Sequence, residues 1–136
     1  MLNYDDVFSG SLKRVLGDGA YNPAFIADFY QTFLNASPFV AEKFADTDMS
    51  AQRTMLHDSL LMLIEFNRTR VPDARLQQLA QIHSRQQLDI PPQFYDVWLD
   101  SLVSAVGSHD PDFDEEVELA WRIALAPGIC LMRFSY

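Results

Sequence analysis

Cysteine is almost absent from this chain of 136 residues, which contains only Cys130. A single cysteine excludes an intramolecular disulfide and any cysteine-rich metal site. Because Cys130 lies in an apolar helical stretch, we expect a buried, unreactive thiol. No apolar run approaches the roughly 20 residues that cross a bilayer, so no membrane partner is expected. Asp5 and Asp6 interrupt the start before any apolar segment, so we expect no secretion signal and a cytoplasmic protein.

Basic residues and histidines are also few. The chain has 10 Lys and Arg against 19 Asp and Glu, and its formal net charge is −9. This charge repels phosphate backbones, and the basic residues form no block, so nucleic acid is excluded as a partner. The only histidines are His57, His83 and His109, and no Glu-x-x-His pair occurs. A di-iron helical bundle is therefore excluded as well.

The sequence does contain apolar residues at helical spacing, separated by short breakers. No segment alternates as a strand does, so the sequence predicts an all-α fold in one domain, 1–136. The predicted elements, in chain order, are a helix over about 3–16, a helix over about 23–36, a brief turn through 39–44, a helix capped by Ser50 and ending near Asn67, a helix opened by Pro72-Asp73 that carries His83, a helix opened by Pro91-Pro92 that carries Phe94 to Val106, and a last helix carrying Val117 to Met132 with a kink at Pro127.

One histidine lies on the apolar face of its predicted helix. Leu76, Leu79, Ala80 and His83 are spaced i, i+3, i+4 and i+7, so the imidazole points inward with the leucines. A core histidine hydrogen-bonded to the backbone would satisfy this pattern. An axial ligand to haem iron would satisfy it too, given an apolar slot and a second helix opposite.

Four motifs follow one another along the chain at regular separations. They are Phe29-Tyr30-x-x-Phe33, then Pro38 and Phe44, then Asp48-Met49-x-x-Gln52-x-x-x-Leu56, and then Leu79-Ala80-x-x-His83. This order resembles the bacterial globins, specifically single-domain relatives of the haem domain of flavohaemoglobins, from about residue 22 to Trp121. The resemblance implies a globin fold of about six to seven helices around a haem pocket. It also implies a b-type haem, held without covalent attachment because no Cys-x-x-Cys-His motif exists.

The resemblance also implies individual roles for residues of this chain. His83 would be the proximal iron ligand, and Tyr30 and Gln52 would form the distal polar pair that donates hydrogen bonds to a bound diatomic ligand. Tyr30 as a simple core aromatic and Gln52 as a solvated helix residue are the alternatives. The remaining residues expected to contact the haem are Phe44 at the corner, Leu56 on the distal wall, Leu79 under the ring, and Tyr95 and Trp98 on the next helix.

The chain departs from flavohaemoglobins in three places. The segment from His83 to Tyr95 is about two residues longer, and the corner from Phe44 to Gln52 is about two residues shorter. In an ungapped comparison Tyr136 stands where those proteins carry a proximal glutamate. A strongly imidazolate-like histidine is therefore in doubt, because that character requires a carboxylate partner.

The implied function is reversible binding of oxygen and other diatomic gases, carbon monoxide and nitric oxide among them. Nitric oxide dioxygenation is also implied, but it would require an external reductase because the chain has no room for one. Asp46, Asp48 and the acidic residues from Asp112 to Glu116 are either a docking rim for a basic reductase or a solvated surface. The alternative function is a haem-free globin-fold sensor or protein-interaction module. The sequence does not predict an oligomeric state.

Overall fold

The computed structural model describes residues 2–136, and over that range it contains seven helices and no strand. This confirms the all-α prediction. The helices are α1 (Tyr4–Leu16), α2 (Pro23–Ala36), α3 (Pro38–Lys43), α4 (Met49–Thr69), α5 (Ala74–Ile82), α6 (Gln93–His109) and α7 (Glu115–Phe134). None of them is long and apolar enough to cross a membrane within the range described.

The helix boundaries follow local capping chemistry. The side chains of Asn22 and Asp73 accept hydrogen bonds from the first backbone N–H groups of α2 and α5, as the sequence predicts. Two expectations change. Residues 39–44, expected as a turn, belong mostly to the helix α3, and the cap of α4 is Asp48 instead of Ser50. The prediction of Ser50 as the N-cap is wrong, because the Ser50 N–H donates to the Asp48 carboxylate and α4 therefore begins two residues earlier than expected.

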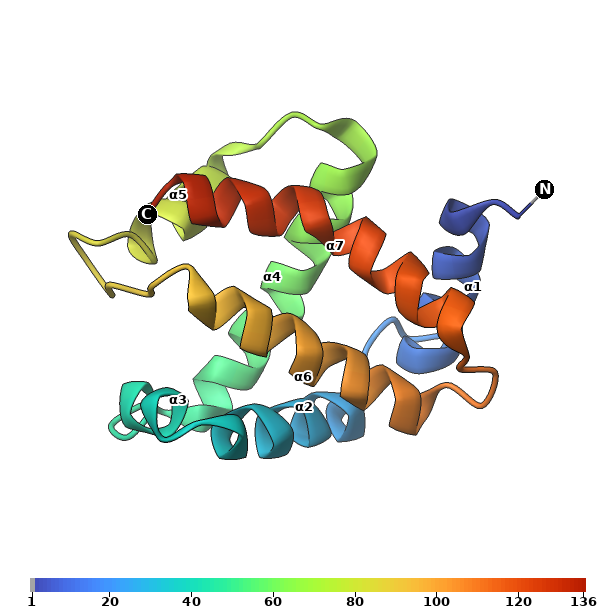
Figure 1. Cartoon of the computed structure of the whole chain (residues 1–136), viewed down its shortest axis with the longest axis horizontal. Helices are drawn as coiled ribbons and strands as arrows, with labels where there is room; N and C mark the ends of the chain where they lie inside the picture. Colours follow the sequence, from blue (N-terminus) through green and yellow to red (C-terminus); the bar gives the residue numbers. More distant parts are fainter. Residues whose placement is uncertain (1) are drawn as a thin grey trace.

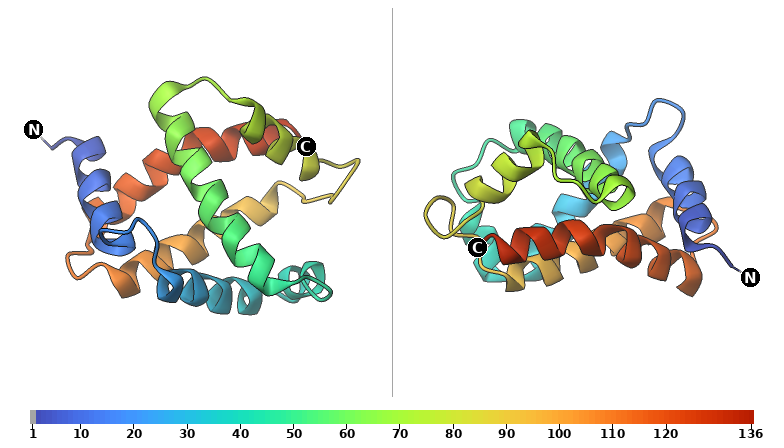
Figure 2. Two further views of the ribbon diagram at one scale, coloured as in Figure 1. Left: turned by 180° about the vertical axis from the view of Figure 1, so that it is seen from behind. Right: turned by 90° about the horizontal axis from the view of Figure 1, so that it is seen from above.

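The helices cross in two layers. In Figure 1, α6 and α7 run across the front of the molecule and α4 passes behind both. Figure 2 shows the same crossing from behind, with α2 packed along α6 and α1 against the start of α7. The core between the layers is aromatic, with Phe25, Phe29 and Trp121 completely buried. The short helices α3 and α5 lie toward one end of the molecule, together with the loop that joins α5 to α6.

The crossing of α4 and α7 depends on a glycine. A Cβ atom added to Gly128 would lie 2.4 Å from Cδ2 of Leu63 on α4, so only a residue without a side chain permits this approach. Pro127 lies directly before it inside α7, where it contributes no backbone N–H. Gly128 thus allows the last helix to pack directly on Leu63 of α4.

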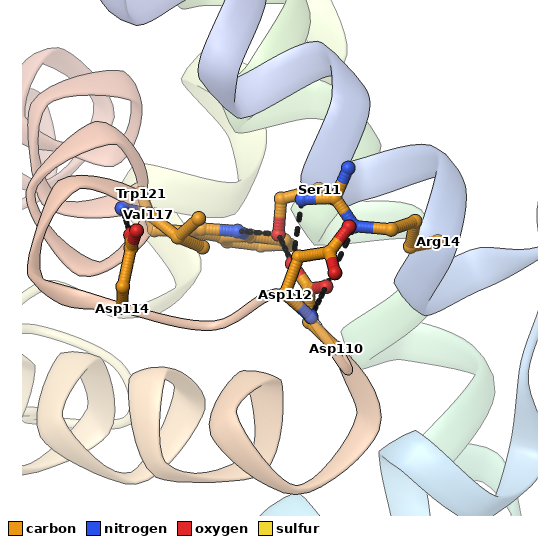
Figure 3. Close-up of polar contacts among 7 residues, drawn as sticks. All are labelled: Ser11, Arg14, Asp110, Asp112, Asp114, Val117 and Trp121. Atoms are coloured by element: carbon orange, nitrogen blue, oxygen red, sulfur yellow. Dashed lines mark hydrogen bonds and ion pairs between the residues drawn. The ribbon is translucent and has the colours of Figure 1, made fainter.

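A buried carboxylate joins α1 to the loop between α6 and α7 (Figure 3). The Asp110 carboxylate accepts hydrogen bonds from Ser11 Oγ at 2.6 Å and from Arg14 Nε at 2.6 Å. Ser11 Oγ in turn accepts a hydrogen bond from Trp121 Nε1 at 2.8 Å. Burial by itself would raise the pKa of Asp110, but the donors around the carboxylate outweigh burial and lower it. The network thus fixes α1 to α7 through an ionised side chain.

Cys130 contradicts the expectation of a buried thiol. It is exposed on the outer face of α7. The apolar stretch around it contains both faces of the helix, since Ile129 and Met132 are buried while Cys130 points the other way. Hydropathy alone did not distinguish these faces because the outer face of α7 is itself apolar.

Candidate functional site

A cavity lies between α2 and α4 on one side and α5, α6 and α7 on the other. It opens to solvent, and its lining is predominantly apolar. All eight residues predicted to contact a haem line it, namely Tyr30, Phe44, Gln52, Leu56, Leu79, His83, Tyr95 and Trp98. Residues that are far apart in sequence therefore line one cavity.

His83 is the C-cap residue directly after α5, and its ring lines the cavity. Its Nδ1 lies 2.8 Å from the backbone carbonyl of Leu79, and its own backbone N–H donates to the same oxygen at 3.2 Å. A carbonyl oxygen only accepts, so Nδ1 carries the proton and Nε2 keeps its lone pair. Burial lowers the pKa of His83, although the bond to Leu79 opposes the shift. The ring is thus a neutral imidazole with one nitrogen available as a metal ligand.

Tyr30 and Gln52 meet across the α2–α4 interface. The Tyr30 hydroxyl donates to the backbone carbonyl of Gln52 at 3.2 Å, not to its side chain. Burial raises the pKa of Tyr30 to about 12, so the phenol stays protonated. The half-buried Gln52 side chain also lines the cavity. The site therefore offers two uncharged hydrogen-bond donors, one of which already has a protein acceptor.

Aromatic rings form the walls next to these donors. Phe44, directly after α3, makes edge contacts with Tyr30 and Phe33, with ring centroids 6.2 Å and 5.8 Å apart. On α6, Trp98 packs edge-on against Phe29, with centroids 5.9 Å apart. Tyr95 lies one turn before Trp98 on the same helix, and burial raises its pKa to about 12. Phe44, Tyr95 and Trp98 thus supply aromatic surface to the lining of the cavity.

No carboxylate lines the cavity among the residues that the structure describes. Tyr136, which stands where flavohaemoglobins carry a glutamate, is directed elsewhere. Its hydroxyl donates to the Asp89 carboxylate, and the Arg85 guanidinium lies 4.8 Å above its ring. The partner of the His83 N–H is therefore a carbonyl, which polarises the imidazole less than a carboxylate does.

Eight further lining residues were not predicted. Met55, Ser59 and Leu63 belong to the same stripe of α4 as Gln52 and Leu56, so extending that spacing along the helix could have found them. Others come from α7 or from the loop before α6, and the sequence carries no local signal that places them here. These are Ile90, Ile129 and Met132, and the list is completed by Phe33 of α2 and Phe94 of α6.

The other two histidines lie outside the cavity. His109 ends α6 and pairs with the Asp28 carboxylate on α2. His57 packs edge-on against Tyr21, with its Nδ1 buried and without a hydrogen-bond partner in the part of the chain described. His83 is thus the one histidine of the chain that lines the cavity.

The donor set fits a haem. A single neutral imidazole faces a cavity whose lining is apolar, and no second histidine, thiol or carboxylate lines it. In addition, no group of three His, Cys, Asp or Glu side chains gathers anywhere within residues 2–136, so a metal held by protein ligands alone has no site there. A planar, largely apolar macrocycle whose metal accepts one imidazole would fit this set of residues.

Comparison with known proteins agrees with the geometry. The globin family model matches residues 27–129, so the chain belongs to the globin family, whose members generally bind haem. The resemblance to bacterial globins is also confirmed. A crystal structure from Pseudomonas aeruginosa PAO1, described as structurally highly homologous to a human hemoglobin, is 40% identical, covers 98% of each chain and gives a TM-score of 0.87. Among curated proteins, none matches the chain.

Proposed function

We propose that this globin holds one b-type haem through His83 Nε2 and uses it to bind oxygen and other diatomic gases reversibly. The observation that carries the proposal is the His83 ring, neutral and fixed by Leu79, at the wall of an apolar cavity. A haem held there by His83 would supply an iron atom able to bind a small diatomic ligand. The rest of the chemistry belongs to the side chains around that ligand.

Two distal side chains would stabilise a bound ligand by hydrogen bonding. The Gln52 amide and the Tyr30 hydroxyl can each donate a hydrogen bond to a ligand that carries partial negative charge, as oxygen does, and less to carbon monoxide. Leu56 and Phe44 line the same space with apolar surface, which would disfavour water beside a bound ligand. Exclusion of water slows protonation of the ligand and the oxidation that follows it.

Uptake of haem by the purified apoprotein tests the proposal. Wild-type protein and a His109→Ala control should each bind one equivalent and develop a Soret band, whereas His83→Ala should bind far more weakly or not at all. The control removes a histidine outside the cavity, so it separates loss of a ligand from general damage. Wild-type protein that takes up no haem would refute the proposal and favour a haem-free interaction module.

We further propose that the oxygen-loaded protein converts nitric oxide to nitrate. One nitric oxide and one oxygen molecule would give one nitrate, and a ferrous haem held by His83 would supply the one electron that balances this reaction. Each turnover after the first would require an electron donor that reduces the ferric haem again. Stopped-flow mixing should show a stoichiometric burst that yields ferric protein and nitrate, with sustained consumption only after a reductant is added. A burst without ferric product would exclude the reaction and leave oxygen binding alone.

A further inference from the structure

The outer face of α7 carries a continuous apolar stripe. Leu119, Ile123 and Phe134 are 42%, 43% and 92% exposed, and the exposed Ala126 and Cys130 lie between them. Their spacing of three or four residues places them on one side of the helix over about four turns. No other element passes in front of α7 in Figure 1. Isolated exposed apolar side chains are common, but a stripe of five in register indicates a binding surface.

The stripe is complementary to itself when a second copy is reversed. We propose that two copies of this chain associate by antiparallel pairing of their α7 helices. A two-fold axis just after Ala126 places Ile123 of one copy opposite Cys130 of the other, and Leu119 opposite Phe134. Both ends of the stripe are then covered, and every contact occurs twice. Ala126 lies at the crossing point, where a small side chain lets two helices approach closely.

Charge determines the direction of the pairing. The first turn of α7 carries Glu115, Glu116 and Glu118, and the last turn carries Arg133. Parallel pairing would place the acidic ends of both helices together in a chain whose net charge is already −9. Antiparallel pairing separates the two acidic ends and brings each toward the last turn of the other copy, which has no acidic residue of α7 and whose Arg133 is paired with Asp96.

The length of the stripe suits an interface between two chains. Residues 119–134 span roughly 22 Å at 1.5 Å per residue, enough to form the apolar centre of an interface of roughly 800 Å² per partner. The flanking Arg122 and Arg133 are already held at the edge of the stripe by Asp100 and Asp96 of α6. They would form the polar rim without first being ordered.

Sedimentation velocity from nanomolar to high micromolar protein tests the association. Wild-type protein should form a dimer, and Ile123→Glu should weaken it roughly a hundredfold or more because two like charges enter the apolar centre. Leu61→Glu is the matched control, since Leu61 is 40% exposed on α4, away from the stripe, and should leave the dimer intact. Phe134→Ser removes an almost fully exposed ring without disturbing the fold and should also weaken the dimer. A wild-type protein that stays monomeric, or a dimer unaffected by both stripe variants, would overturn the proposal.

Crosslinking tests the direction of pairing. In the antiparallel register two Cys130 residues lie about 10 Å apart along the helices, seven residues at 1.5 Å, so wild-type protein should form no disulfide when oxidised by air with a copper–phenanthroline catalyst. Ile123→Cys with Cys130 retained should give a covalent dimer, and Ile123→Cys combined with Cys130→Ser should not. A Cys130 disulfide in wild-type protein would indicate a different register and overturn the antiparallel model.

Discussion

Replacing Tyr30 with phenylalanine removes one hydroxyl and leaves the ring packing intact. In the structure that hydroxyl donates to the Gln52 carbonyl at 3.2 Å, so its single proton must leave this acceptor before it can serve a gas ligand. A neutral hydrogen bond contributes about 0.5–1.5 kcal/mol and one to a partly charged acceptor about 1.5–3 kcal/mol. The net stabilisation of bound oxygen by Tyr30 is the difference between these two hydrogen-bond energies, about 1–2 kcal/mol. Tyr30→Phe should therefore release oxygen roughly five- to thirtyfold faster.

Gln52 provides the comparison that makes this reasoning testable. No hydrogen bond holds its side-chain amide among the residues described, so Gln52→Leu should lose the full contribution and raise the oxygen off-rate roughly ten- to a hundredfold. The structure thus predicts that Gln52 matters more than Tyr30. Flash photolysis and ligand-replacement stopped flow would give both rates, with carbon monoxide as the ligand that should change little. A larger effect of Tyr30→Phe, or equal effects on oxygen and carbon monoxide, would refute this division of roles.

Three further measurements follow from the geometry. Asp110→Asn should lower the free energy of unfolding in urea at neutral pH by about 2–3 kcal/mol, because the ionised carboxylate holds Ser11 and Arg14. Folding lowers the pKa of Asp110, so the contribution of its carboxylate to the free energy of unfolding is complete above pH 3.8, the ordinary pKa, and is lost as the pH falls through the lower pKa of the folded state. Identical acid-unfolding curves for the wild-type protein and Asp110→Asn would contradict this. Gly128→Ala should lower the free energy of unfolding by about 1–3 kcal/mol and shrink the cavity, because the new Cβ would push Leu63 toward it. Adding Leu63→Ala should relieve that clash. Unchanged stability of Gly128→Ala would refute the close approach of α7 to α4. The pKa of His83 is lowered by burial, so an NMR titration of the apoprotein should show its ring neutral to below pH 6.5, and a higher midpoint would contradict its placement.

Local signals predicted the helices, whereas the resemblance to bacterial globins supplied most of the site residues. Asn22-Pro23 and Asp73 indicate helix starts from the sequence alone. The spacing from Leu76 to His83 predicts that the imidazole points inward, and it requires no information about any other helix. Residues on one stripe of α4 were predictable for the same reason, because helical periodicity fixes their common face.

Other features depend on contacts that no local pattern encodes. The sequence does not reveal that Ile129 and Met132 reach the cavity, since their position depends on the crossing of α7 and α4 at Gly128. The Tyr30 hydroxyl was expected to point at a ligand, and only the packing of α2 on α4 provides the backbone acceptor that it uses. The exposure of Cys130 has the same origin, because an apolar stripe exists on both faces of α7.

The shared carbonyl of Leu79 has a kinetic consequence. It accepts both the backbone N–H and the ring N–H of His83, so fraying at the end of α5 also frees the imidazole to rotate. A group held by Nε2 would oppose that local opening with its own binding energy. Hydrogen exchange at the amides of residues 82–84 should therefore slow markedly once the cavity is filled, and the escape of the bound group should follow the same opening rate.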